Sequence, residues 1–431
     1  MNRIYLAGLL CIVTAVSCLA ETFTPKSYIK AVLDSSLSMR KAEESLKQAE
    51  DSYWSSILDT LLPSLSLSMS NGLYDNREPI WRFRKKEVIS SLSASWSLYD
   101  SASSPAAKLK RVKLDHETAQ LAFFTSKQNE ALKAITRFNA LYSAQKRLAT
   151  AKANLASRES QYNDTNSQYQ SGTRSKAEVT QSEGDKLQSE LALAQAESAW
   201  VKALISFNEL INVDFEAPQE ALISTQAAVT VTLPFPKEDI GKALADNFSL
   251  RQQRLSLEKT RLENHTNLLS NLPRFKVDAS WRKSSLGWFG TPASAWDEDR
   301  TYNVGASLSF PFGFMGVQNY LDVSAKKSAL RSSELEMQNS VRSLRVSVLS
   351  AQKDIELQVK SQKLLEFQIK AQKEAVDNLL LDYSQGGANS QQLDVVYTKL
   401  LDARNNLINA VNDLDVSLVN YRVLLGEKIW E

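Results

Sequence analysis

Apolar and polar residues alternate with a period of two in four short segments of the chain. In segments 64–70 and 91–98, leucine, methionine, alanine or tryptophan alternates with serine. In segments 275–281 and 302–310, apolar and aromatic residues alternate with mostly polar ones. Because successive side chains of a strand point to opposite faces, each segment predicts a β-strand with one apolar and one polar face.

Most of the remaining chain has the helical period instead. Apolar residues recur every three or four positions from about 103 to 170, and one face of this segment carries Leu121, Phe124, Gln128, Ala131, Ile135, Phe138 and Tyr142. A helix of sixty-odd residues is on the order of 100 Å long, which no globular core requires. Shorter helices are predicted over 26–62 and 237–272, each followed by a proline that ends it.

The same order of elements occurs twice. Tyr169-Gln170-Ser171-Gly172 recurs 214 residues later as Tyr383-Ser384-Gln385-Gly386, and Leu62-Pro63 recurs as Leu272-Pro273. Each half runs helix, two strands, then two very long helices joined by a turn. We therefore divide the chain into a first repeat, a proline-containing linker and a second repeat, which cover residues 21–212, 213–236 and 237–431.

Residues 1–20 form a predicted export signal, with Arg3, an apolar core and small residues at the end. Two processing routes compete. Cleavage after Ala20 is the favoured route, and acylation of Cys18 at an imperfect lipobox is the alternative. Because Cys11 and Cys18 are the only cysteines, the processed chain is expected to lack a disulfide.

Charge and hydropathy narrow the functional classes. The 51 Lys and Arg residues nearly balance 49 Asp and Glu, and no basic stripe indicates nucleic-acid binding. After residue 20, no stretch has the ~20 apolar residues of a membrane helix. If the protein crosses a membrane, it therefore does so as strands.

Three features favour membrane strands over a half-buried soluble sheet. The strands approach the ~9–11 residues that cross a bilayer, the chain has an export signal, and aromatic residues lie near the expected strand ends. These aromatic residues are Tyr74, Tyr99, Trp281, Tyr302 and Phe310. Four strands cannot close a barrel, and open edges are not tolerated in lipid, so the chain is expected to oligomerise. Three chains give twelve strands.

The repeated order of helix, Leu-Pro, strand pair and long hairpin with a Tyr-x-x-Gly turn resembles the TolC-type outer membrane efflux family over 21–431. The resemblance implies a mainly α fold with membrane β. A long α-helical coiled-coil barrel would join a β-barrel formed by four strands per chain in a homotrimer. It also implies an outer membrane location in a Gram-negative-type cell, with most of the chain in the periplasm.

The function implied by the resemblance is an exit duct of a tripartite efflux or type I secretion system. Such a duct passively conducts substrates and works with a periplasmic adaptor and an inner membrane pump. The alternative from another class is a periplasmic coiled-coil scaffold or adaptor without a pore. No enzyme is expected, because His116 and His265 lack partners at metal-ligand spacing and no phosphate loop or nucleophile motif occurs. Neither a cofactor nor a metal is expected.

The two hairpin turns are the predicted functional site. The residues alone predict a helix-ending glycine with left-handed backbone and a tyrosine packed beneath it. The resemblance places these turns at the periplasmic mouth, where the adaptor docks. The residues concerned are Tyr169, Gly172, Tyr383, Gly386 and Gly387.

Some family members carry acidic residues just after the second turn, where they form a ring that constricts the pore. In this chain Gln392 and Val395 occupy the expected positions, with Asp394 between them. Glu178 is the counterpart in the first repeat. We name Glu178, Gln392 and Asp394 as candidates for a pore constriction, and a solvated helix face is the favoured alternative for Asp394.

Overall fold

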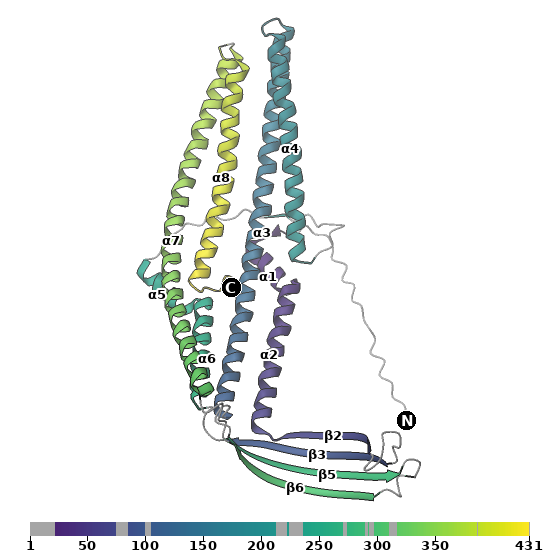
Figure 1. The fold of residues 1–431 in the computed structure, drawn as a ribbon. Coiled ribbons are helices and arrows are strands. Elements are labelled where there is room, and N and C mark those ends of the chain that lie inside the picture. Colours follow the sequence, from purple (N-terminus) through teal and green to yellow (C-terminus); the bar gives the residue numbers. More distant parts are fainter. Residues whose placement is uncertain are drawn as a thin grey trace.

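The computed structural model describes residues 22–74, 85–99, 105–212, 222–223, 236–269, 274–288, 292, 297–309, 317–385 and 387–430. Its largest elements are two helical hairpins. The first joins α3 (Pro105–Gln170) to α4 (Lys176–Leu210), and the second joins α7 (Val317–Ser384) to α8 (Ser390–Leu424). Both hairpins extend away from a four-stranded sheet at the other end of the molecule (Figure 1).

Shorter helices run beside the sheet-proximal halves of α3 and α7. They are α1 (Pro25–Ser35), α2 (Leu37–Leu61), α5 (Pro236–Asp246) and α6 (Phe248–Leu269). Within the described part of the chain, no helix combines the length and the hydropathy that crossing a membrane requires.

The two continuous helices predicted over 26–62 and 237–272 are each broken. Ser36 has extended backbone (φ −61°, ψ 130°), and its Oγ bonds Ser38 Oγ at 2.7 Å. Asn247 accepts from Leu250 N at 3.0 Å and donates to Leu424 O at 3.0 Å. The Asn247 side chain therefore takes the place of a backbone acceptor and starts α6. Ser36 makes no side-chain bond to the backbone of α2, and its hydroxyl bonds Ser38 and, at 3.4 Å, Glu130 Oε2 of α3.

The main sheet is antiparallel, in the order β2-β3-β5-β6. Its strands are β2 (Ser64–Tyr74), β3 (Lys85–Tyr99), β5 (Arg274–Trp288) and β6 (Asp297–Ser309). The strands are longer than predicted, because β2 extends to Tyr74 and β5 to Trp288. Within the described residues, β2 and β6 each pair on one side only.

A second, small sheet was not predicted. Strand β1 (Thr22–Phe23) pairs in parallel with β4 (Leu222–Ile223), which lies in the predicted linker. The pairing ties the beginning of the first repeat to the segment between the repeats. The assignment of 213–236 as a linker between two repeats stays a prediction.

The strand register sorts the main sheet into an apolar and a polar face. Two apolar rows cross all four strands, namely Leu65-Ala94-Ala279-Val304 and Leu67-Leu92-Trp281-Tyr302. Two polar rows alternate with them, namely Ser66-Ser93-Ser280-Asn303 and Ser68-Ser91-Arg282-Thr301. Serine hydroxyls of β2 and β3 hydrogen-bond across the polar face, with Oγ–Oγ distances of 2.6 to 2.8 Å.

Trp281 and Tyr302 were predicted near strand ends, but they lie in the middle of β5 and β6. They nevertheless mark a boundary between apolar and charged residues on one face of the sheet. The next row on the same face contains Lys283 and Arg300, and both contact Glu298, at 2.7 and 3.4 Å. The aromatic pair therefore separates apolar rows from a charged row. The side chains of Tyr74 and Tyr99, and all of Phe310, lie outside the described residues.

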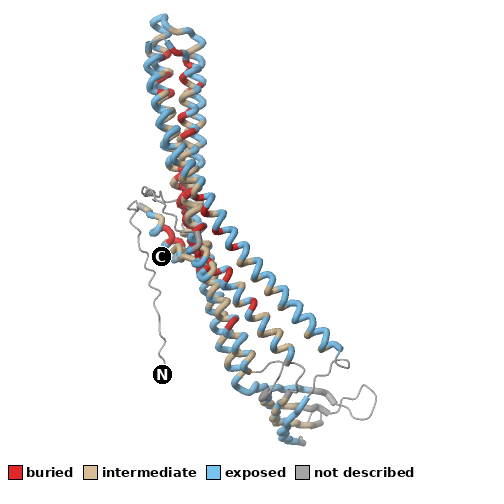
Figure 2. The backbone as a smooth tube through the Cα atoms, turned by 90° about the vertical axis from the view of Figure 1, so that its left-hand side faces the viewer, coloured by how far each residue is buried: buried red, intermediate tan, exposed pale blue. Residues whose placement is uncertain are grey.

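Buried residues concentrate where the short helices meet the long hairpins (Figure 2). In the first repeat, Tyr28 stacks on Phe207 at 3.8 Å and also contacts Phe138. The corresponding positions of the second repeat hold Asp239, Tyr421 and Gln352, which are joined by buried hydrogen bonds. Burial, aided by the bond with Asp239, raises the pKa of Tyr421. One core is thus aromatic and its counterpart is polar.

Candidate docking and gating site at the hairpin tips

The first hairpin turn is closed by its own backbone. Gly172 has φ +80°, its N–H donates to Tyr169 O at 2.9 Å, and Thr173 N–H donates to Gln168 O at 2.9 Å. This pair of bonds is a Schellman motif, for which glycine is the favoured residue at positive φ. A capping box then starts α4, because Ser175 Oγ accepts from Glu178 N and Glu178 Oε2 accepts from Ser175 N.

The second turn uses the same devices with different residues. Gly387 N–H donates to Asp382 O at 2.9 Å, and Asn389 and Gln392 form the capping box of α8. Gly387 has no positive φ, and Gly386 lies outside the described residues. The left-handed glycine expected at each turn is therefore present at Gly172, while Gly387 does not provide it.

Arg174 connects the two turns. Its guanidinium donates to Tyr383 O at 2.9 Å and to Ala388 O at 3.2 and 3.3 Å, both in the second hairpin. Within its own hairpin it bonds Gln168 Oε1 at 3.0 Å and Glu178 Oε1 at 2.8 Å. The guanidinium carbon also lies 4.3 Å from the centre of the Tyr383 ring. The side chain is only 9% exposed, so the bridge is largely shielded from water.

A second bridge lies further from the tip. The buried Arg158 of α3 donates to Asp394 Oδ1 of α8 at 2.5 Å, and its Nη1 lies 3.9 Å from Asp185 Oδ2 of α4. It also lies over the ring of Tyr397 at 4.9 Å. Burial, and after it the Asp394 carboxylate, raise the pKa of Asp185. One cation therefore holds two carboxylates from different hairpins.

The two tyrosines of the predicted tip site differ in burial. Tyr383 is 4% exposed and its hydroxyl lies 2.7 Å from Thr165 Oγ1, whereas Tyr169 is 41% exposed. The packing expected for both tyrosines thus occurs at the second turn alone. Cys18 lies outside the described residues.

The three candidates for a pore constriction make specific contacts. Glu178 and Gln392 occupy equivalent capping positions, and Asp394 pairs with Arg158. The backbone N–H of Ser175, above other causes, lowers the pKa of Glu178. A pore-lining role for these residues stays a prediction.

Sequence reasoning missed Arg174, Arg158 and Thr165. The position of Arg174, two residues after Gly172, was a usable signal, because arginine near a helix end can bond exposed carbonyls. Arg158 and Thr165 lie in a uniform helical pattern that does not reveal which side faces the other hairpin.

The histidines do not form a site. His116 packs against Tyr53 at 4.9 Å and contacts Gln120, and His265 is exposed on α6. Across the described ranges, no group of three or more His, Cys, Asp or Glu residues is arranged to hold a metal ion.

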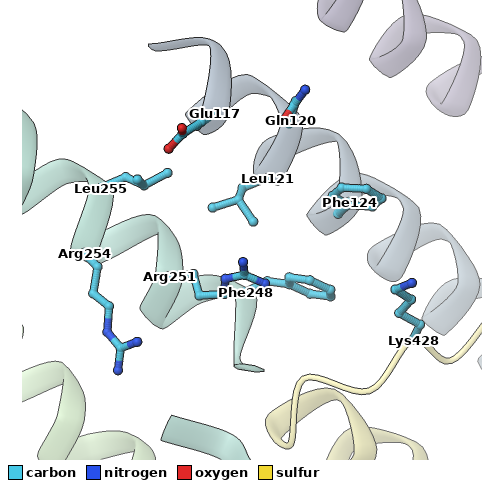
Figure 3. Close-up of a pocket in the computed structure, with 9 residues that line it drawn as sticks. All are labelled: Glu117, Gln120, Leu121, Phe124, Phe248, Arg251, Arg254, Leu255 and Lys428. Carbon is cyan, nitrogen blue, oxygen red and sulfur yellow. The ribbon is translucent and has the colours of Figure 1, made fainter. Parts of the chain in front are cut away.

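Away from the tips, a pocket lined by side chains lies between α3 and α6 (Figure 3). A pocket of about 540 Å³ is lined by Leu121 and Phe124 of α3, Phe248 and Arg251 of α6, and Lys428 near the C-terminus. No predicted site residue lines this pocket.

The architecture defines a class of protein: two repeats of a sheet-forming strand pair joined to a very long helical hairpin. The sequence profile of the outer membrane efflux protein family matches residues 28–213 and 240–427. The chain therefore belongs to the outer membrane efflux protein family, which confirms the resemblance. Comparison with curated protein sequences finds no significant match.

Solved channel structures have the same fold. The crystal structure of CusC, which concerns folding and transmembrane channel formation, has a TM-score of 0.77 and 13% identity, covering 93% of this chain and 92% of that one. The Campylobacter jejuni CmeC outer membrane channel gives 0.76 and 14%, covering 93% and 85%. The open state of the Neisseria gonorrhoeae MtrE channel gives 0.69 and 17%, covering 94% and 89%. The predicted fold class, mainly α with a small sheet, is confirmed.

Proposed function

We propose that this outer membrane efflux family channel is a homotrimeric exit duct that conducts substrates passively from a periplasmic adaptor and inner membrane pump to the exterior. The observation that carries the proposal is the combination of a two-faced sheet with two free edges and helical hairpins joined at their tips. Each part of this combination supports one feature of the duct.

The sheet edges support assembly. Strands β2 and β6 lie at opposite edges of the sheet, so β6 of one chain can pair with β2 of the next. Three chains would close a twelve-stranded barrel without leaving backbone groups unpaired in lipid. The apolar side chains on β2 and β6 are highly exposed in the single chain, with Leu67 and Val304 78% and 80% exposed.

The two faces of the sheet support its orientation. In a barrel, the rows of Leu67 and Leu65 would face lipid and the rows of Ser66 and Ser68 would line a water-filled lumen. The Trp281–Tyr302 pair, next to the charged row at Arg300, would then lie near the membrane surface, where aromatic side chains are favoured.

Exposed helix faces support the same assembly along the rods. Three apolar residues of α7, Leu357, Leu364 and Phe367, are 65 to 69% exposed. On α4, Leu187 and Leu191 are 58 and 59% exposed. These faces lie on different hairpins. Packing of α7 of one chain against α4 of its neighbour would bury both faces and continue the barrel as a helical tunnel.

The tip contacts support a gate. Because Arg174 and Arg158 join the two hairpins through a few polar contacts, the hairpins can separate without unfolding either one. We propose that these contacts hold the tip closed and that an adaptor docking at the two turns releases them. The pore would open by relative shifts of packed coiled coils.

Cross-linking tests the assembly. Cysteines are placed at Phe367 of α7 and Leu191 of α4, which lie at similar distances from the tips, and outer membranes are oxidised without reducing agent. The proposal predicts a ladder that ends at a covalent trimer. A control pair at Leu357 and Leu187, whose levels along the rods differ by about 24 Å, is expected to give no covalent trimer. Only monomer, or only dimer, at the Phe367–Leu191 pair would contradict the proposed trimer.

A further inference from the structure

A line of direct hydrogen bonds joins the two hairpins along α3 and α8. From the C-terminal end of α8 toward the tip, Gln128 donates at 3.3 Å to the carbonyl oxygen of Glu427, just beyond α8, Arg147 donates to Asn409, and Arg158 donates to Asp394. Nearer the tip, Gln161 Nε2 donates to Ser390 Oγ at 3.3 Å. The line ends where Thr165 Oγ1 lies 2.7 Å from the hydroxyl of Tyr383 at the end of α7. We call this line the α3–α8 seam.

The seam has one interruption. Between the levels of Gln128 and Arg147, Asn139 of α3 and Asn412 of α8 line a cavity of about 160 Å³ and make no bond to each other. Asn139 is 2% exposed, and neither its Nδ2 nor its Oδ1 has a protein partner. Asn412 Oδ1 is also buried and unpaired.

Unpaired buried amide atoms require an explanation. Leaving one buried donor or acceptor unsatisfied is costly, and native proteins rarely do so. Exchanging the two amide atoms of Asn139 by a side-chain flip does not help, because both lack partners. The cavity therefore presents one acceptor and two donor hydrogens from Asn139, together with one acceptor from Asn412.

The remaining walls define the rest of a matching ligand. Leu407, Ile408 and Val411 of α8 make one side apolar, and Tyr142 of α3 contributes an aromatic ring. Lys146 lies 5.3 Å from the centre of that ring. An engineered cavity of about 150 Å³ holds a benzene molecule. Because this cavity is partly open to solvent, it can hold an apolar ring of that size with a small polar group attached. Two unpaired carbonyl oxygens disfavour an anion in the cavity.

We infer that this cavity is a binding site for a small neutral molecule that carries a carboxamide next to an apolar group of about benzene size. The ligand amide would donate to the Oδ1 atoms and accept from Asn139 Nδ2, while its apolar group would contact the α8 wall. Bound there, it would restore the missing contact between α3 and α8. The inference does not depend on the gating role of the tip.

Benzamide is the probe for this site. Calorimetric titration and saturation-transfer NMR are carried out on the full-length protein purified in detergent, with acetophenone and benzoate as comparison compounds. Acetophenone replaces the amide NH₂ by a methyl group of similar size. We expect one benzamide to bind per chain, and acetophenone and benzoate each to bind at least about tenfold more weakly. Acetophenone has no N–H group, so the Oδ1 atoms would stay unpaired. Benzoate would place its negative charge next to these oxygens.

Two variants locate the binding. Asn139→Leu removes the amide, and Val411→Phe fills the cavity from α8 while leaving Asn139 in place. Both are expected to abolish benzamide binding, whereas Asn163→Leu, on an exposed position of the same helix, is expected to leave it unchanged. If Asn139→Leu does not assemble, Val411→Phe still decides the matter.

Three results would overturn the inference. Absence of benzamide binding to the wild-type protein would mean that water alone fills the cavity. Equal binding of acetophenone would remove the role of the amide. Unchanged binding in Val411→Phe would place benzamide elsewhere on the protein.

Discussion

Replacing Arg174 by alanine is expected to separate the two hairpin tips. The change removes the bonds to Tyr383 O and Ala388 O and the contact with the Tyr383 ring. Each hydrogen bond from a charged donor contributes about 1.5–3 kcal/mol, and a cation–π contact about 0.5–1 kcal/mol. The lower limits sum to about 3.5 kcal/mol for two bonds and one cation–π contact. Because the freed carbonyls at the tip can bind water, we take a slightly smaller total, about 3 kcal/mol.

A loss of about 3 kcal/mol has a measurable effect on the tip. It changes an equilibrium constant ~140-fold, since 1.4 kcal/mol corresponds to about tenfold. If separated tips make up about 1% of wild-type molecules, the variant would contain about 60%. Arg174→Lys keeps the charge but loses the planar fork, so its population is expected to lie between the two.

Double electron–electron resonance measures this population. Spin labels at Lys176 and Gln391, exposed positions just after the two turns, report the distance between the hairpins. Labelled chains are diluted with unlabelled ones so that a trimer carries one labelled chain. Arg345→Ala, an exposed arginine of α7 away from the tip, is the control. A distance distribution in Arg174→Ala that matches wild type would refute the reasoning.

Further predictions concern the sheet, the glycines and the seam. Leu67→Arg is expected to abolish the trimer in a heat-modifiability assay, because a cation on the lipid face costs about 2–4 kcal/mol. Ser66→Arg, on the opposite face, is expected to leave the trimer intact. Equal tolerance of the two substitutions would contradict the proposed orientation of the sheet. Gly426→Ala is expected to lower the thermal midpoint more than Gly172→Ala. Both glycines have positive φ, but only at Gly426 would a Cβ lie 2.4 Å from neighbouring backbone. Because the pKa of Asp185 is raised above 3.8, the folded state binds its proton more tightly, so this group's contribution to stability falls as pH rises through the interval above 3.8. Asp185→Asn is therefore expected to flatten the pH dependence of the thermal midpoint in that interval, and an unchanged profile would contradict the assignment.

Most of the fold was predictable because its elements have strong local periods. The alternation in 64–70 and 275–281 gave the strands, and the three–four spacing gave the rods. The helix breaks at Ser36 and Asn247 were missed because single serine and asparagine residues also occur inside helices. Their long-range bonds, to Glu130 Oε2 and to Leu424 O, cannot be seen in a local pattern. The β1–β4 pair was missed because two-residue strands carry no period.

The candidate site was only partly predictable. Both turns were located from their glycines, and the capping boxes at Ser175–Glu178 and Asn389–Gln392 follow from sequence spacing alone. The bridges made by Arg174 and Arg158 require the relative position of two hairpins. That position is set by core packing of residues more than two hundred positions apart, which no local pattern reports.

Single-channel recording tests the central claim most directly. Purified wild-type protein is inserted into a planar lipid bilayer, and its conductance is compared with that of Arg174→Ala. The account predicts discrete conductance steps for both proteins, with a larger mean conductance for the variant because its tip is open more often. Absence of steps from both proteins, with the purified protein remaining a soluble monomer, would contradict the account.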